Sequence, residues 1–338
     1  MKITGSCAAG FVLFWLLVPV AFAQEPGKVP GAPSTIRIGS SLVLVDVISQ
    51  DPKSGLPIRD LKKEDFRVFD NGHEVPITSF DAGSRNDTRQ LVVWLVVICN
   101  EQGKVGGSAQ FAGNQALFRP ALERLDKRDT VGVAHWCDNG ETQLDLLPTE
   151  DRDKPIGILA ETLKPISFHV GGDSDAVGEQ AFRKMVRLII QDAYRRNPQP
   201  LPVLVFLDGD HTGQPKAELN ELVDDLLETS GIVFGIKDER SPSPGLLLFE
   251  QGEIMHFMAR QTGGQFFAVA PSGFAGALEA IVMQLHFRYE LGFVPAVIDG
   301  KRHKLKVMLA KEVKGKYRGV RLKFRTEYIP TAVPDWAR

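Results

Sequence analysis

Between residues 91 and 287, short apolar runs alternate with segments in which apolar residues recur every three or four positions. A continuous apolar run of this length is typical of a strand buried in a parallel sheet, and the longer period is typical of a helix with one buried face. Six runs are predicted strands: 91–98, 130–136, 142–147, 203–207, 232–236 and 265–269. The helical pattern covers 108–126, 152–164, 176–195, the stretch around 219–227, 251–262 and 274–285. The alternation predicts an α/β domain with a mostly parallel sheet and helices on both faces.

Two local signals refine this prediction. A turn-forming segment, 138–141, separates the second and third predicted strands, so 142–147 is expected to be an antiparallel edge strand. Pro120 lies inside the first helical segment and is expected to kink or split it.

Both ends of the chain have β patterns. Near the amino end, strands are expected at 42–48, 66–69 and 75–80, with a tight hairpin at Asn71-Gly72. After residue 287 they are expected at 288–293, 304–309 and 320–325, and in the last two basic residues alternate with apolar ones as on a solvated face. Neither end has enough strands to be stable alone, so together they predict one small β-sandwich.

Composition narrows the function classes. The chain has 338 residues, 43% of them apolar and 24% charged, which is typical of a globular protein. Its formal net charge of -2 gives no polybasic character, so nucleic acid is not an expected partner.

The first 23 residues have the pattern of a secretory signal peptide. Lys2 precedes an apolar stretch, 11–22, and Ala21-Phe22-Ala23 resembles a cleavage site, so the mature chain is predicted to start at Gln24. An uncleaved anchor is the alternative. After cleavage no membrane span is expected, and the protein should be exported to the periplasm or the extracellular space. Residues 24–35 are rich in Pro and Gly and are expected to form a flexible linker.

Export leaves two cysteines, Cys99 and Cys137, in the mature chain. Each directly follows one of two predicted strands that should be parallel neighbours. A disulfide is therefore feasible in an oxidising compartment. Two buried free thiols are the alternative.

Asp208 is the first polar residue after the apolar run 203–207. Ligands of open α/β sheets bind at the carboxyl ends of the strands, which makes Asp208 a candidate binding residue. The alternative is a simple Asp-Gly turn.

Four stretches, in order, resemble the von Willebrand factor A-related proteins of the acidobacterial type. They are Leu42 to Val47 with Leu61 to Gly72 and Ile77 to Phe80, then Val203 to Gly209, then Ala259 to Phe267, and last Arg288 to Phe293 with Asp299 to Val307 and Val320 to Arg325. The resemblance implies a Rossmann-like A domain inserted in a β-sandwich made from both chain ends. The expected parts are the sandwich halves 36–82 and 288–328, the A-like domain 88–287, and a tail, 329–338.

The resemblance also implies where a divalent cation would bind, at a metal-ion-dependent adhesion site. That site uses an Asp-x-Ser-x-Ser motif after the first strand, a Thr from a second loop, and an Asp after the fourth strand. Asp208 stands at the last of these positions. Here Asn100 and Lys104 stand in the first motif, and Asp173 or Ser174 replaces the Thr. The candidate ligands are therefore Asp208, Asn100, Asp173 and Ser174, and the site is expected to be degenerate, with no cofactor or only weakly bound Mg²⁺.

Two functions follow. The first is an exported binding or adhesion module that recognises an unidentified envelope or extracellular protein at the carboxyl edge of its sheet. The second is a small-ligand or enzyme-like α/β domain that uses Asp208 and the loop 99–107. The chain contains neither G-x-S-x-G nor H-E-x-x-H, and no catalytic residues are expected, which favours the first.

Overall fold

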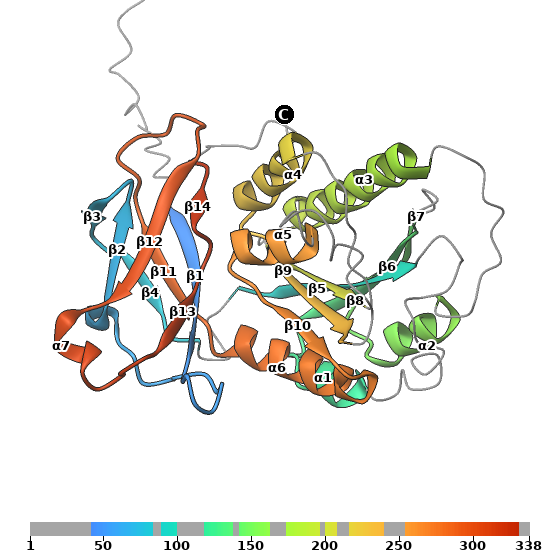
Figure 1. Cartoon of the computed structure of the whole chain (residues 1–338), viewed down its shortest axis with the longest axis horizontal. Coiled ribbons are helices and arrows are strands. Elements are labelled where there is room, and N and C mark those ends of the chain that lie inside the picture. The colour runs from blue at the N-terminus through green and yellow to red at the C-terminus, as the bar shows by residue number, and fades with distance from the viewer. Residues whose placement is uncertain are drawn as a thin grey trace, which may run out of the picture. The chain divides into compact units, whose positions relative to one another are not determined.

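The computed structural model of the protein describes residues 42–83, 89–99, 118–137, 142–162, 174–196, 200–207, 216–239 and 254–330. Its largest sheet has six strands in the order β10-β9-β8-β5-β6-β7 (Figure 1). In chain order these are β5 (Leu91–Cys99), β6 (Thr130–Cys137), β7 (Thr142–Thr149), β8 (Leu201–Leu207), β9 (Ile232–Asp238) and β10 (Phe266–Val269).

Five of these strands run parallel, and β7 alone pairs antiparallel, with β6. The six predicted strands and the antiparallel edge are therefore confirmed. β5 lies at the centre of the sheet between β6 and β8, and its nine residues form an uninterrupted apolar run. Both faces of a central parallel strand are covered, which is why the run does not alternate with polar residues.

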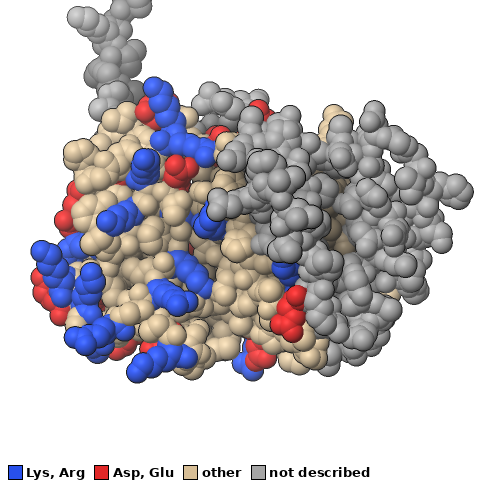
Figure 2. Space-filling view, in the orientation of Figure 1, with Lys and Arg blue, Asp and Glu red and all other residues tan. Residues whose placement is uncertain are grey.

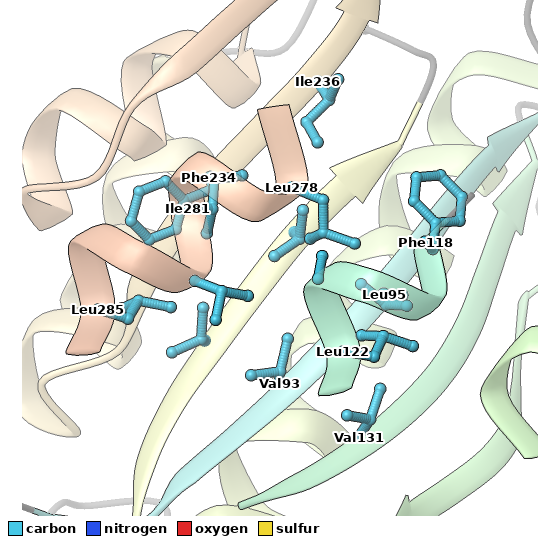
Figure 3. Packing of buried hydrophobic residues seen from close by; sticks show 14 of the residues in the cluster. Val93, Leu95, Phe118, Leu122, Val131, Phe234, Ile236, Leu278, Ile281 and Leu285 are labelled. Carbon is cyan, nitrogen blue, oxygen red and sulfur yellow. The ribbon is translucent and has the colours of Figure 1, made fainter. Parts of the chain in front are cut away.

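The side chains of β5 separate into two cores. Val93 and Leu95 belong to the cluster under α1 (Arg119–Glu123), α2 (Asp153–Thr162) and α6 (Phe274–His286), and Figure 3 shows them facing Leu122 and Leu278. Trp94 and the other alternate residues of β5 belong to a second cluster, under α3 (Ser174–Arg195), α4 (Lys216–Glu228) and α5 (Ile254–Thr262). Successive strand residues point to opposite faces, so one strand anchors both helix layers.

The helix α1 is shorter than the period of the sequence predicts. Within the described residues it covers Arg119–Glu123, and Pro120 lies in its first turn. Proline is tolerated at that position because the first amides of a helix have no intrahelical acceptor. Pro120 thus lies at the start of α1. The earlier part of the predicted segment, 108–117, lies outside the described residues, so the kink or split of the longer helix stays a prediction.

Two further sheets have four strands each, in the orders β13-β1-β11-β4 and β14-β12-β2-β3. The amino-terminal part of the chain supplies β1 (Val43–Gln50), β2 (Phe66–Asp70), β3 (His73–Val75) and β4 (Ser79–Asp81), with a 3-10 turn at Lys63–Asp65. The carboxyl-terminal part supplies β11 (Tyr289–Phe293), β12 (His303–Leu309), β13 (Arg321–Lys323) and β14 (Glu327–Tyr328), with a short helix, α7, at Lys311–Lys314.

Strands from the two chain ends pair with each other in both of these sheets. β1 pairs antiparallel with β11, so that Val45 lies opposite Leu291, and β12 pairs with β2, so that Val307 lies opposite Val68. All four side chains belong to a single buried apolar cluster. We call these eight strands and their common core the two-sheet unit.

One predicted strand of the amino-terminal part was wrong in detail. The expected strand 75–80 is divided at Pro76: β3 ends at Val75 and pairs with β2, whereas β4 pairs with β11 in the other sheet. Pro76 cannot donate a ladder hydrogen bond, which explains the break. The hairpin at Asn71-Gly72 is present, with both residues at positive φ.

The basic residues of the last predicted strand are not all solvated. β13 covers only Arg321–Lys323, and Arg325, two residues further on, is buried with 7% of its surface exposed. On β12, by contrast, Lys304 and Lys306 are exposed as expected. Alternation alone could not distinguish a solvated face from one covered by another part of the chain.

Candidate functional site

The carboxyl edge of the large sheet brings together two of the predicted site positions. β5 ends at Cys99 and β8 ends at Leu207, and the two strands pair with Val97 opposite Leu207. Asn100 and Asp208 therefore follow neighbouring parallel strands at the same edge. Their side chains lie outside the described residues, so the structure establishes where the chain enters these positions and nothing about their contacts.

The other two predicted ligands come from a second loop. Asp173 lies outside the described residues, and of Ser174 the structure describes only the backbone, as the first residue of α3. Within the described ranges, no three His, Cys, Asp or Glu side chains gather where they could hold a metal ion. The donors themselves fit a cation poorly, since Asn100 is neutral and Lys104 is cationic where the resemblance implies acidic and hydroxyl groups.

The two cysteines of the predicted disulfide end neighbouring strands. β5 and β6 are parallel, and Cys99 lies directly opposite Cys137 in their register. Adjacent strands are separated by about 4.8 Å, which is inside the range of about 4.4–6.8 Å between the Cα atoms of disulfides. The predicted proximity of the two positions is thus confirmed, and the bond between them stays a prediction.

A buried contact between a histidine and a carboxylate lies close to the same edge. His135 of β6 and Asp145 of β7 face each other with 2.9 Å between Nδ1 and Oδ2, and both side chains are about nine-tenths buried. The carboxylate of Asp145 therefore pairs with a side chain of the neighbouring strand, which fixes the edge strand β7 to the sheet.

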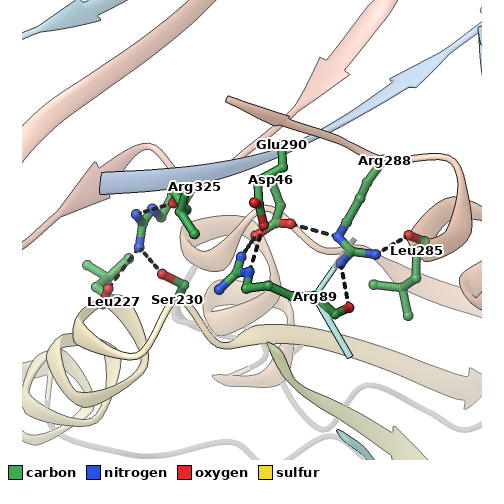
Figure 4. A network of polar contacts seen from close by, with 9 residues as sticks. Asp46, Arg89, Leu227, Ser230, Leu285, Arg288, Glu290 and Arg325 are labelled. Carbon is green, nitrogen blue, oxygen red and sulfur yellow. Dashed lines mark hydrogen bonds and ion pairs between the residues drawn. The ribbon is translucent and has the colours of Figure 1, made fainter. Parts of the chain in front are cut away.

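A second group of charges joins the large sheet to the two-sheet unit (Figure 4). It consists of Asp46 on β1, Arg89 just before β5, Arg288 after α6, Glu290 on β11 and Arg325 after β13. We call these residues the junction cluster. Asp46 accepts hydrogen bonds from Arg89 at 2.6 Å and from Arg288 at 2.7 Å, and Arg89 also contacts Glu290 at 2.7 Å.

Backbone carbonyl groups complete the junction cluster. Arg288 donates to the carbonyl of Leu285 at 2.6 Å, and Arg325 donates to those of Leu227 at 2.9 Å and Leu44 at 2.6 Å. Leu227 belongs to α4 and Leu44 to β1. The guanidinium of Arg325 therefore connects a helix of the large sheet directly to a strand of the two-sheet unit.

Burial and charge act in opposite directions on these groups. Burial by itself raises the pKa of Asp46, but the charges of Arg89 and Arg288 outweigh it and hold that pKa below its usual value. Burial lowers the pKa of Arg325 to about 10, against the attraction of Asp46. Sequence reasoning missed this cluster because its members are up to 279 positions apart, between Asp46 and Arg325, and nothing in their local patterns connects them.

The comparisons with solved structures find partial similarities to other proteins. Conserved hypothetical protein BatB from Bacteroides thetaiotaomicron is 15% identical with a TM-score of 0.38, over 59% of this chain and 97% of that one. An aerotolerance-related membrane protein from Bacteroides fragilis is 14% identical with a TM-score of 0.39, over 59% of this chain and 98% of that one. The SpRpn10 VWA domain is 11% identical with a TM-score of 0.39, over 58% of this chain and 94% of that one.

At these identities and TM-scores, the similarities assign neither a family nor a function to the chain. No family model and no curated protein sequence matches it. Among the described residues, no helix combines the length and the apolar character needed to cross a membrane. The predicted signal peptide, 1–23, and the linker, 24–35, lie outside those residues.

Proposed function

We propose that the protein is an exported binding module of the von Willebrand A type, which recognises a protein partner at the carboxyl edge of its six-stranded sheet. The observation that supports the proposal is the register of β5 and β8, in which the last residues of the two strands end at one edge of the sheet. In open α/β sheets this edge is where ligands bind. The sequence resemblance described above gives the proposal its class of protein.

Recognition at this edge is proposed to need no metal ion. Only Asp208 matches the ligand set that the resemblance implies, while Lys104 places a positive charge where a hydroxyl group would bind the cation. A fixed ammonium group repels Mg²⁺ and is itself able to pair with a partner's carboxylate. Any binding of Mg²⁺ through Asp208, Asn100, Asp173 and Ser174 is therefore weak.

The two-sheet unit is proposed to be the β-sandwich that carries this module. Its single apolar core, shared by strands from both chain ends, supports that interpretation. The junction cluster then holds the A-like domain, 88–287, against its carrier. In this arrangement the carboxyl edge of the large sheet is left to the partner, and the linker 24–35 follows the signal peptide.

The second candidate function is a small-ligand or enzyme-like domain that uses Asp208 and the loop 99–107. Two experiments separate the candidates. The exported protein is used to capture proteins from envelope extract with and without EDTA, and it is also screened for bound nucleotide and titrated with Mg²⁺ by calorimetry. The proposal predicts capture that EDTA does not reduce and no micromolar, Asp208-dependent Mg²⁺ binding. Bound nucleotide without any captured protein would support the second candidate.

A further inference from the structure

A groove of about 340 Å³ lies where the large sheet meets the two-sheet unit, away from the carboxyl edge discussed above. One wall is formed by the end of α5 and the start of β10, and the other by β13 and the residues after it. The volume is at the lower end of the range of about 300–1,000 Å³ for ligand sites.

Gly263 brings these two walls together, and Gly264 packs the first wall against β9. Gly263 ends α5 with a φ of +85°, and a Cβ atom there would lie 2.6 Å from the backbone of Phe324 and Arg325. At Gly264 a Cβ atom would lie 1.9 Å from the carbonyl oxygen of Val233. The chain therefore passes too closely for any side chain, and backbone forms the groove at this point.

Among the described residues, the charged side chains that line the groove are basic, and none of them is Asp or Glu. The ammonium group of Lys323 contacts the side-chain oxygen of Gln265 and has no carboxylate within 4 Å among the described residues. Arg260 is exposed beside the ring of Phe257, with 5.9 Å between its guanidinium carbon and the ring centre. Two positive charges therefore border the groove without a described acidic partner.

The surface around the groove has the same sign. Arg321, next to Lys323 on β13, is exposed, and its charge contributes to the low pKa of Lys323. In the space-filling view, Lys and Arg side chains gather where Figure 1 places β1 and β13, while Asp and Glu lie at the margins of that area (Figure 2). This face attracts anions.

Aromatic rings give the groove an apolar side. Phe266 lies parallel to the ring of His256, with 5.7 Å between their centres, and packs over Gly235 of β9. Phe324 and Leu322 line the opposite wall. A ligand in the groove therefore meets apolar surface between positive charges.

Both walls end in outer strands. β10 is the last strand of the large sheet and β13 is the last strand of its small sheet, and each has one neighbouring strand among the described residues. An outer strand is where an extended peptide is able to pair with a sheet.

From these observations we infer that the groove binds an extended acidic peptide of a partner protein, with a carboxylate held by Lys323 and Arg260 and flanking apolar side chains against Phe266 and Phe324. This second binding surface is separate from the one at the carboxyl edge. It does not depend on Asp208, Asn100 or a metal ion. The acidic groups of such a peptide are complementary to the basic side chains of the groove, and its apolar residues are complementary to the aromatic rings. Its extended backbone is able to pair with the outer strands β10 and β13.

The titration behaviour of Lys323 is consistent with this inference. Burial, with a smaller contribution from Arg321, lowers the pKa of Lys323 to about 8. Among the described residues, the groups facing it are Gln265 just before β10 and, across the groove, Arg260 and His256 on α5, and none of them is acidic. A bound carboxylate would stabilise the charged ammonium group, so peptide affinity should fall as the pH rises above about 8.

The test is selection from a phage-displayed library of random heptapeptides on the exported full chain. Selected peptides are then measured against the double variant Lys323→Gln, Arg260→Gln. The expected result is enrichment of Asp or Glu between apolar residues, and binding to the double variant weakened roughly tenfold or more, because a charge-assisted hydrogen bond is lost. Lys323→Arg should retain binding because it keeps the charge.

The matched control is Lys304→Gln, Lys306→Gln, which removes the same charge from exposed positions on β12. It should bind the selected peptides as the unaltered protein does, and equal melting temperatures establish that all variants are folded. The inference is overturned if no peptides are enriched, if those enriched lack acidic residues, or if the double variant binds them as tightly as the control. The Asp208 variant leaves this binding unchanged, so the result stands or falls independently of the proposed function.

Discussion

At the scale of single residues, Asp46 shows how the chain satisfies a buried charge. Its carboxylate lies between the guanidinium groups of Arg89 and Arg288, and the side chain of Arg288 is only 1% exposed. Removing one member of a buried ionic group leaves its partners without compensation, which costs much more than losing an exposed ion pair. The loss of unfolding free energy when one of these charged side chains is replaced therefore tests whether the group is buried as the structure shows.

We predict that Arg288→Met reduces the free energy of unfolding by about 3–5 kcal/mol. The thioether chain fills much of the volume but cannot pair with Asp46 or with the carbonyl of Leu285. The exposed pair Lys154–Asp151 provides the control, and Lys154→Met should change stability by less than about 0.5 kcal/mol. Denaturant titration measures both, and equal effects would contradict the account of the junction cluster.

The low pKa of Asp46 predicts how stability depends on acid. A carboxyl group whose pKa is lowered on folding contributes stability above its unfolded pKa of 3.8, and this is lost as the pH falls through the folded value. Asp46→Asn should therefore be less stable than the unaltered protein at pH 7, and the difference should shrink steadily below about pH 4. Urea titrations between pH 7 and pH 3 measure the difference in unfolding free energy between the two proteins. A difference that stays constant over this range would contradict the prediction.

The opposed positions of Cys99 and Cys137 lead to a prediction about the mature exported protein. Under denaturing, non-reducing conditions it should contain no reactive thiol, because the two cysteines have formed a disulfide across β5 and β6. A bond that closes a loop of this size contributes roughly 4 kcal/mol in the chain-entropy model. Thiol counting with a chromogenic reagent decides the matter, and two reactive thiols per chain would exclude the bond.

At the scale of elements, the end of α5 packs directly against the two-sheet unit. The sequence predicts a helix that ends at residue 262, and α5 does end at Thr262, directly before Gly263. It gives no sign that residues 324 and 325 pack against that helix end. Glycine is needed at position 263 for two reasons. The backbone there has a positive φ, and the backbone of residues 324 and 325 leaves no space for a side chain.

We predict that Gly263→Ala lowers the free energy of unfolding by at least about 2 kcal/mol, since alanine is strained at positive φ and its methyl group meets backbone. Gly276→Ala is the matched control. Gly276 lies in α6 with nothing within 4 Å of an added Cβ, so that change should stabilise by about 0.5–1 kcal/mol. Thermal unfolding of both variants tests the pair, and a neutral Gly263→Ala would show that the close approach is absent.

Other elements show which features the sequence was able to predict. The strands β5 and β8 were found because a fully buried strand has a continuous apolar run. The residues 75–80 were misjudged because Pro76 divides them between two sheets, and a window of six residues carries no information about pairing partners. Burial of Arg325 was missed for the same reason, since a basic residue near the end of a β segment is usually exposed.

At the scale of the whole molecule, the order of strands along the chain carried more information than any single motif. Two β segments that were each too short to be stable, on either side of an α/β pattern, predicted that the chain ends would associate, and β1 does pair with β11. The groove and the junction cluster both lie where distant segments meet. Their residues, Lys323 and Asp46 among them, could not be assigned before the segments were placed together.

The central claim is that a protein partner binds at the carboxyl edge of the large sheet. Its most direct test is quantitative capture from envelope extract by three forms of the exported protein: unaltered, Asp208→Arg at the carboxyl edge, and Lys127→Glu, an exposed position before β6 at the opposite edge. The account predicts that the unaltered protein and Lys127→Glu retain the same specific partner with or without EDTA, and that Asp208→Arg loses at least nine-tenths of it, roughly the effect of 1.4 kcal/mol. Undiminished capture by Asp208→Arg, together with loss in Lys127→Glu, would contradict it.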